Sequence, residues 1–200
     1  MYYISRCKQG EQMSVELKKL NFRRFAKNGA EMYGLLESNR ARLSPWFWWA
    51  DKSVTPNKIR FYLFMALYIT DTNRKKIVHK IKSAKSYDEQ FFIYNDGKIA
   101  GMCGLDNIDV KNKQDAEVWY LTFRGNPFGT ADLAIKWIEN YCINSGLNSM
   151  YAKIQSTNEK SLKLVDRNDY TIESVAQDVQ ISKRNTNHAD IITYKKQLTR

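Results

Sequence analysis

The sequence predicts an α+β (α/β) fold with a mixed, mostly antiparallel sheet flanked by helices. Periodicities of two and of 3.6 residues alternate along the chain. Strand hairpins come first and a strand–helix–strand unit follows, which favours a sheet that is partly parallel. The chain has 200 residues, 43% of them hydrophobic and 26% charged, and no segment resembles a linker. We therefore expect residues 1–200 to form a single domain.

The N-terminal half contains the first strand and two helical stretches. Residues 14–20 alternate as a strand does, and residues 25–38 carry apolar side chains at helical spacing. Pro45 should end this regular structure. Thr55 followed by Pro56 is typical of a helix start, and the helical stretch that it opens runs to about residue 86.

A β-hairpin at residues 89–105 is the clearest local prediction. Two alternating runs flank Asn95-Asp96-Gly97, and Asp-Gly supplies the positive φ angles of a tight hairpin turn. Further elements follow in order: a strand at 116–123, a helix that ends at Gly146, a strand at 148–155, a short helix at 158–167, and strands near 170–180 and 189–197.

The formal net charge of +11 indicates an acidic partner or substrate. Six Lys or Arg residues and no acid lie between residues 73 and 87. This basic segment could form an amphipathic helix that follows phosphate groups, although runs of charge are more often only the solvated face of a helix. Nucleic acid, an anionic cofactor and an acidic protein all remain open as partners.

The same composition excludes several other classes of protein. The N-terminal residues lack the apolar core of a secretory signal, and the longest apolar stretch, residues 61–69, is too short to span a bilayer. We expect a cytoplasmic protein without a membrane partner, either a monomer or a homodimer. Three widely spaced cysteines, two histidines and no CxxC predict neither a disulfide framework nor a metal site.

Four stretches, in this order, resemble the GNAT superfamily of N-acetyltransferases, in particular the branch that acetylates the N-terminal serine or alanine of ribosomal proteins. They are ESNRARLSPWFWWAD (37–51), YNDGKIAGMCGLDNID (94–109), AEVWYL (116–121) with the loop and helix that follow it, and GLNSMYAKIQSTNEKSLKLVDRNDYTIES (146–174). The similarity spans almost the whole chain. It implies a splay between two central parallel strands, 116–123 and 148–155, with acetyl-CoA bound there and an amine as acceptor. A protein N-terminus is the first choice of acceptor, and small amines such as polyamines are the alternative.

The resemblance also implies where the cofactor binds. Its pyrophosphate loop corresponds to residues 124–129, with Pro127 in the place of a fixed glycine. We expect Asn126 to cap the following helix, Pro127 to be its first residue, and the next three N–H groups to face the phosphates. An N–H group between Leu121 and Phe123 should polarise the acetyl carbonyl. The cofactor-binding residues are then Leu121, Phe123, Arg124, Gly125, Asn126, Phe128, Gly129, Thr130 and Asn158.

Catalytic and acceptor residues follow from the same resemblance. Ser161 would protonate the departing thiolate, although a serine at a helix start is equally a capping residue. Glu117 and Asp178 are the alternatives for the general base, together with a chain of water molecules. The acceptor pocket is expected to be lined by Trp46, Trp48, Trp49 and Tyr120.

A second function stays open at this point. Because Pro127 departs from the family pattern, the chain could be a catalytically silent GNAT-fold module. It would then dock on RNA, the ribosome or another acidic partner through the basic segment 73–87.

Overall fold

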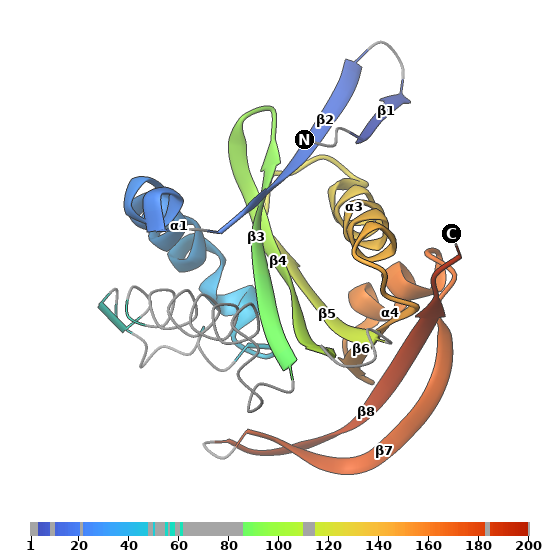
Figure 1. Cartoon of the computed structure of the whole chain (residues 1–200). Coiled ribbons are helices and arrows are strands. Elements are labelled where there is room, and N and C mark those ends of the chain that lie inside the picture. Colours follow the sequence, from blue (N-terminus) through green and yellow to red (C-terminus); the bar gives the residue numbers. More distant parts are fainter. Residues whose placement is uncertain are drawn as a thin grey trace.

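The computed structural model describes residues 4–8, 11–20, 22–47, 50, 55, 57–58, 61, 86–109, 115–182 and 185–199. Helices and strands carry the labels of Figure 1. The predicted helical stretch from Thr55 to residue 86 lies largely outside these residues, as do Trp48 and Trp49. Its start is partly described, because the N–H group of Lys58 donates to the Thr55 hydroxyl at 3.4 Å, as expected of a helix cap.

One eight-stranded sheet forms the centre of the molecule, in the order β1-β2-β3-β4-β5-β6-β8-β7 (Figure 1). Neighbouring strands are antiparallel except for β5 and β6, which run parallel. The bounds are β1 Ile4–Lys8, β2 Glu11–Lys19, β3 Ser86–Asn95, β4 Lys98–Asp109, β5 Asp115–Thr122, β6 Ser149–Gln155, β7 Thr171–Ser182 and β8 Asn185–Gln197. The mixed, mostly antiparallel sheet is therefore confirmed.

Helices cover both faces of this sheet. Helix α1 (Phe22–Leu43) lies on one face, and α3 (Thr130–Asn144) and α4 (Glu159–Asp166) lie on the other (Figure 1). We refer to these as the α1 face and the α3 face. Within the described residues, no helix has the length and apolar character needed to cross a membrane.

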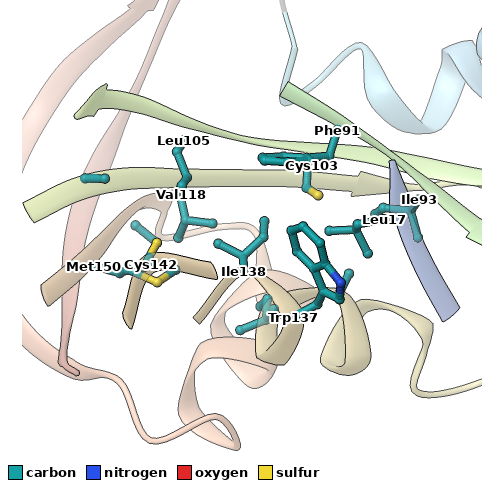
Figure 2. Close-up of a cluster of buried hydrophobic side chains, with 14 of the residues drawn as sticks. Leu17, Phe91, Ile93, Cys103, Leu105, Val118, Trp137, Ile138, Cys142 and Met150 are labelled. Carbon is teal, nitrogen blue, oxygen red and sulfur yellow. The ribbon is translucent and has the colours of Figure 1, made fainter. Parts of the chain in front are cut away.

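The larger core lies between the sheet and the α3 face helices (Figure 2). The rings of Phe91 and Trp137 meet edge to face with their centroids 5.2 Å apart, and the Trp137 ring stacks on Tyr141 at 5.6 Å. Apolar side chains from five strands fill the rest of this layer, among them Leu17, Ile93, Cys103, Leu105, Val118 and Met150. This packing fixes α3 against the middle of the sheet.

A second core joins α1 to the opposite face. Met32, Leu36 and Leu43 lie along one side of the helix and are almost fully buried against β3, β4 and β5. Phe47, just beyond the helix, packs against the same cluster. Helix α1 is longer at both ends than its apolar spacing predicted.

Most local predictions are confirmed. The hairpin turns at Asp96 and Gly97, with φ angles of 47° and 77°, which are the positive values that the sequence required. Helix α3 ends as expected, since Gly146 has a φ of 81° and its N–H group donates to the Ile143 carbonyl. Strand β1 was not expected from the sequence.

Candidate active site

The two parallel strands separate shortly after they begin, which creates a fork in the sheet. Strand β5 pairs with β6 only from Asp115 to Glu117, opposite Ser149 to Tyr151. Beyond that point β5 stays paired with β4 as far as Thr122, and β6 stays paired with β8 as far as Gln155. The splay between central parallel strands is therefore present at the predicted place.

The register of β5 decides which N–H groups face this fork. The Phe123 N–H group donates to the Ala100 carbonyl of β4 at 2.8 Å. Because N–H groups alternate sides along a strand, the Leu121 N–H group also points to β4, whereas those of Tyr120 and Thr122 point towards the fork. Within the predicted stretch from Leu121 to Phe123, the Thr122 N–H group is therefore the one that faces the fork, and those of Leu121 and Phe123 point to β4 instead.

The end of β5 is fixed by α1. The Arg124 N–H group donates to Asn39 Oδ1 at 2.9 Å, and the Arg42 guanidinium bonds to the Thr122 carbonyl. Burial lowers the pKa of Arg42, and the positive charge of Arg124 lowers it further. The Arg124 N–H group is thus committed to α1, so only its side chain could contact an anionic ligand.

The loop before α3 differs from its prediction. Helix α3 starts at Thr130, and its N-cap is Gly129, which has a left-handed backbone (φ 95°) and no side-chain cap. Asn126 is not a cap, because its side-chain amide donates to the carbonyls of Ala100 and Phe123 at 2.7 and 2.9 Å. Pro127 is not the first helical residue. Its carbonyl accepts from both the N–H group and the hydroxyl of Thr130, at 3.3 and 2.8 Å.

The helix still offers donors to an anion. The first turn of α3 leaves N–H groups without acceptors inside the helix, and the helix dipole makes this end positive. The Thr130 N–H group already donates to the Pro127 carbonyl, so an anion would be bound by the other N–H groups of that turn. Gly125, with a φ of 88° and open space around it, leaves room beside the same loop. Pro127 therefore reshapes the loop without closing it.

A hollow of about 320 Å³ lies beside this helix start, lined by Phe128, Asp132, Lys136, Arg167 and Asn168. The Arg167 guanidinium holds the Asp132 carboxylate through contacts of 2.7 and 3.0 Å, and Asn168 adds one of 3.1 Å. Burial alone would raise the pKa of Asp132, but these bonds lower it overall, so this carboxylate is ionised and compensated. The Phe128 side chain is 80% exposed, with Arg167 over its ring.

This hollow suits the nucleotide end of coenzyme A. An exposed aromatic ring can stack on a purine, and the neighbouring Lys and Arg side chains can meet phosphate groups. The acid in the hollow is already neutralised by Arg167. The residues present therefore fit the cofactor that the sequence implied.

Helix α4 brings two predicted residues to the same side of the fork. Asn158 caps the helix, and its side chain accepts from the Ser161 N–H group at 3.3 Å. Burial raises the pKa of Tyr120 to about 12, and the nearby Ser161 side chain opposes part of that rise. No described residue meets the buried Tyr120 hydroxyl with ordinary hydrogen-bond geometry. Tyr120 thus lies with Ser161 on the α3 face, away from Trp46 near the end of α1.

The two predicted bases occupy different places. Glu117 is the last β5 residue paired with β6, and its carboxylate forms an ion pair with Lys153 at 2.9 Å. Asp178 is an exposed residue at an irregular position of β7, where it contacts His188 at 3.1 Å. Strands β6 and β8 both lie nearer the fork than β7 does. The structure therefore brings Glu117 to the fork and leaves Asp178 at the edge of the sheet.

Sequence reasoning missed two residues beside Glu117. The Trp119 indole N–H group donates to Asp106 Oδ1 at 3.0 Å, and Asp106 lies directly opposite Glu117 in the register of β4 and β5. The Trp119 ring rests on Gly104, where an added Cβ would meet ring atoms at 2.6 Å. The alternation of side chains along β4 and β5 was the one sequence signal that could have placed Asp106 and Trp119 on the same face. That alternation does not predict that the two side chains are in contact.

The chain matches the family model described as an acetyltransferase (GNAT) domain over residues 57–191. No curated protein sequence matches it significantly. Several solved structures share its fold at low sequence identity, 15%, 20% and 16% for the three described next.

Three of these structures illustrate the likeness. One is RimL, a ribosomal L7/L12 alpha-N-protein acetyltransferase in complex with coenzyme A, 15% identical with a TM-score of 0.73, covering 92% of this chain and 94% of that one. Another is the microcin C7 self-immunity acetyltransferase MccE with acetyl-CoA and AMP, 20% identical with a TM-score of 0.71, covering 92% of each chain. The third is Mycobacterium smegmatis RimJ with a CoA disulfide, 16% identical with a TM-score of 0.70, covering 92% and 82%.

Since the family model covers well over half of the chain, the protein belongs to the GNAT acetyltransferase family. It is an N-acetyltransferase that uses acetyl-CoA as acetyl donor.

Proposed function

We propose that this acetyltransferase acts on the free α-amino group of a protein. The observation that carries the proposal is the fork between β5 and β6, whose strands stop pairing after Glu117 and Tyr151. Groups suited to the cofactor lie on the α3 face, and carboxylates lie on the α1 face beside the fork. An ammonium group approaching from the α1 face would meet these negative charges before it met the acetyl group.

Several residues would hold acetyl-CoA, which supplies the acetyl group as a thioester. The hollow around Phe128 and Arg167 would take the nucleotide end, and the start of α3 would face the pyrophosphate. Asn158 would bond to the pantetheine arm, a role compatible with its function as the cap of α4. Arg124 would contribute its side chain only.

The chain's own groups then have three tasks. The N–H groups of Tyr120 and Thr122 face the fork and are positioned to stabilise negative charge on the acetyl oxygen. Ser161 would give a proton to the departing sulfur, and the neutral Tyr120 phenol beside it supports this role. Holding amine and thioester together on opposite sides of one fork supplies much of the rate advantage through positioning.

The choice of a protein N-terminus draws support from the relatives. RimL is an alpha-N-protein acetyltransferase, and its fold matches 92% of this chain. The stretches that resemble this branch in sequence, residues 94–109 and 146–174, contribute β4, β6 and α4. The acceptor is therefore proposed to be a polypeptide rather than a small polyamine.

A panel of acceptors tests this proposal. Peptides with a free N-terminal Ser or Ala are compared with the same peptides blocked at the N-terminus, each containing one Lys, and with spermine. Release of CoA thiol gives the rate, and mass spectrometry locates the acetyl group. We expect acetylation of the free α-amine only. Transfer to spermine without transfer to any free N-terminus would contradict the proposal.

Docking on RNA or the ribosome is a second candidate, supported by the charge of +11 and the basic segment 73–87. All of that segment except Ser86 and Tyr87 lies outside the described residues, so this role stays a prediction. It requires binding that weakens steeply as salt is raised, because each phosphate contact releases a counterion. Affinity for RNA that is unchanged at several hundred millimolar salt would argue against it.

A further inference from the structure

We propose that Asp106 is the general base that takes a proton from the acceptor amine, and that Trp119 positions its carboxylate. This inference rests on the amine acceptor proposed above and deepens it. Neither residue figured in the sequence-based prediction of the site, and both are placed by contacts between β4 and β5.

Asp106 lies on the face from which the acceptor would approach. Its neighbour Leu105 belongs to the core on the α3 face, so the Asp106 side chain points to the α1 face. Trp119 likewise packs against the cluster that includes α1. Asp106 is opposite Glu117, the last residue of β5 that is paired with β6. The carboxylate therefore lies one strand away from the point where β5 and β6 separate.

Its position is held from two directions. Trp119 Nε1 donates to Asp106 Oδ1 at 3.0 Å, which leaves Oδ2 available to another group. The indole can lie flat across β4 only because residue 104 is glycine, since a Cβ there would come within 2.6 Å of the ring. The pair Trp119 and Gly104 thus fixes one oxygen of the carboxylate and leaves the other for the amine.

The surrounding charges favour Asp106 over Glu117 as the base. The Glu117 carboxylate is paired with Lys153 of β6 at 2.9 Å, and that ammonium group also lies over the Tyr151 ring. Asp88 of β3 accepts a bond from the Asn107 N–H group at 3.0 Å. No Lys, Arg or His in the described part of the chain forms an ion pair with Asp106. Of the two carboxylates Asp106 and Glu117, Asp106 is therefore the one whose charge has no paired cation among the described residues.

These surroundings adjust the basicity of Asp106 in the useful direction. Burial raises its pKa, the negative charges of Asp88 and Glu117 raise it further, and the bond from Trp119 lowers it, with a result of about 6. A base with this pKa is ionised at neutral pH and still accepts a proton more readily than an ordinary aspartate. It would also attract the ammonium form of the acceptor.

The proton balance of the step is complete. The acceptor arrives as an ammonium ion and gives one proton to Asp106, and its nitrogen then forms a bond to the acetyl carbon as the bond from carbon to sulfur breaks. The nitrogen loses a second proton, which replaces the one that Ser161 gives to the sulfur. Asp106 afterwards releases its proton to solvent, so that one proton leaves per turnover.

Asp106→Asn, which keeps an acceptor for Trp119, is compared with Glu117→Gln and with wild type. All are assayed on the acceptor of the panel above that wild type acetylates fastest, so a failure of the N-terminal specificity does not affect this test. We expect kcat/KM of wild type to rise with pH through about 6, as Asp106 loses its proton. Asp106→Asn should lose this limb and about 100-fold in kcat/KM at pH 7, with affinity for acetyl-CoA unchanged within about twofold. In Glu117→Gln, kcat/KM should still rise with pH at the acidic end of the profile.

A measurement without substrate checks the ionisation directly. The indole N–H resonance of Trp119, identified by its loss in Trp119→Phe, should titrate in wild type near the same pH and stay constant in Asp106→Asn. An unchanged pH profile and rate in Asp106→Asn would overturn the proposal. So would loss of the acidic limb in Glu117→Gln alone, or an indole resonance that does not titrate.

Discussion

Replacing Asp106 with Asn should stabilise the fold at neutral pH. The pKa of this carboxyl is about 6 in the folded protein, compared with an ordinary aspartate value of 3.8. The folded protein therefore holds the proton more tightly than the unfolded chain, and the free energy of unfolding falls as pH rises from about 4 to about 6. A difference of about 2 pKa units corresponds to at most about 3 kcal/mol, at 1.36 kcal/mol per unit. Because the carboxyl is partly exposed, we expect a gain of about 1–2 kcal/mol.

Thermal unfolding at several pH values measures this gain. For a chain of this length, 1 kcal/mol raises Tm by about 2–4 °C. Asp106→Asn should therefore unfold several degrees above wild type at pH 7.5 and close to wild type at pH 4, where both side chains are neutral. Lys163→Ala, an exposed change on α4, serves as the control and should behave alike at both values. A variant that is less stable than wild type at pH 7.5 would refute the reasoning.

Three further substitutions probe the fork and the cofactor side. Gly104→Ala should push the Trp119 ring away and lower the free energy of unfolding in urea by about 1–3 kcal/mol. Gly34→Ala, in an open part of α1, is the control and should raise it by about 0.5–1 kcal/mol. Equal effects would contradict the packing argument. Arg167→Gln should weaken acetyl-CoA binding about tenfold by calorimetry, because it removes a cation from the hollow; unchanged affinity would exclude this hollow as the nucleotide site. Asn158→Ala should cost about 1 kcal/mol of stability, because α4 loses its cap. If Asn158 also contacts the cofactor, the variant should bind acetyl-CoA more weakly as well, which loss of the cap alone does not explain.

The elements of this fold depend on patterns that lie close together in the sequence. Asp96 and Gly97 define the hairpin turn, Gly146 ends α3, and Asn158 caps α4, and each was predictable because backbone conformation there depends on the residue itself and its neighbours. The loop at 124–129 was harder to predict. Asparagine is a residue type that often caps helices, but the Asn126 side chain instead donates to the carbonyls of Ala100 and Phe123.

The sequence by itself determined the order of strands and helices, the positions of the tight turns and the family resemblance. Only the tertiary structure decided which N–H groups face the fork, that Asp132 is neutralised by Arg167, and that Asp106 lies beneath Trp119. These features depend on strand register and on contacts between residues that are far apart along the chain. A shift of one residue in register would turn each side chain to the other face, and local residue patterns do not fix that choice.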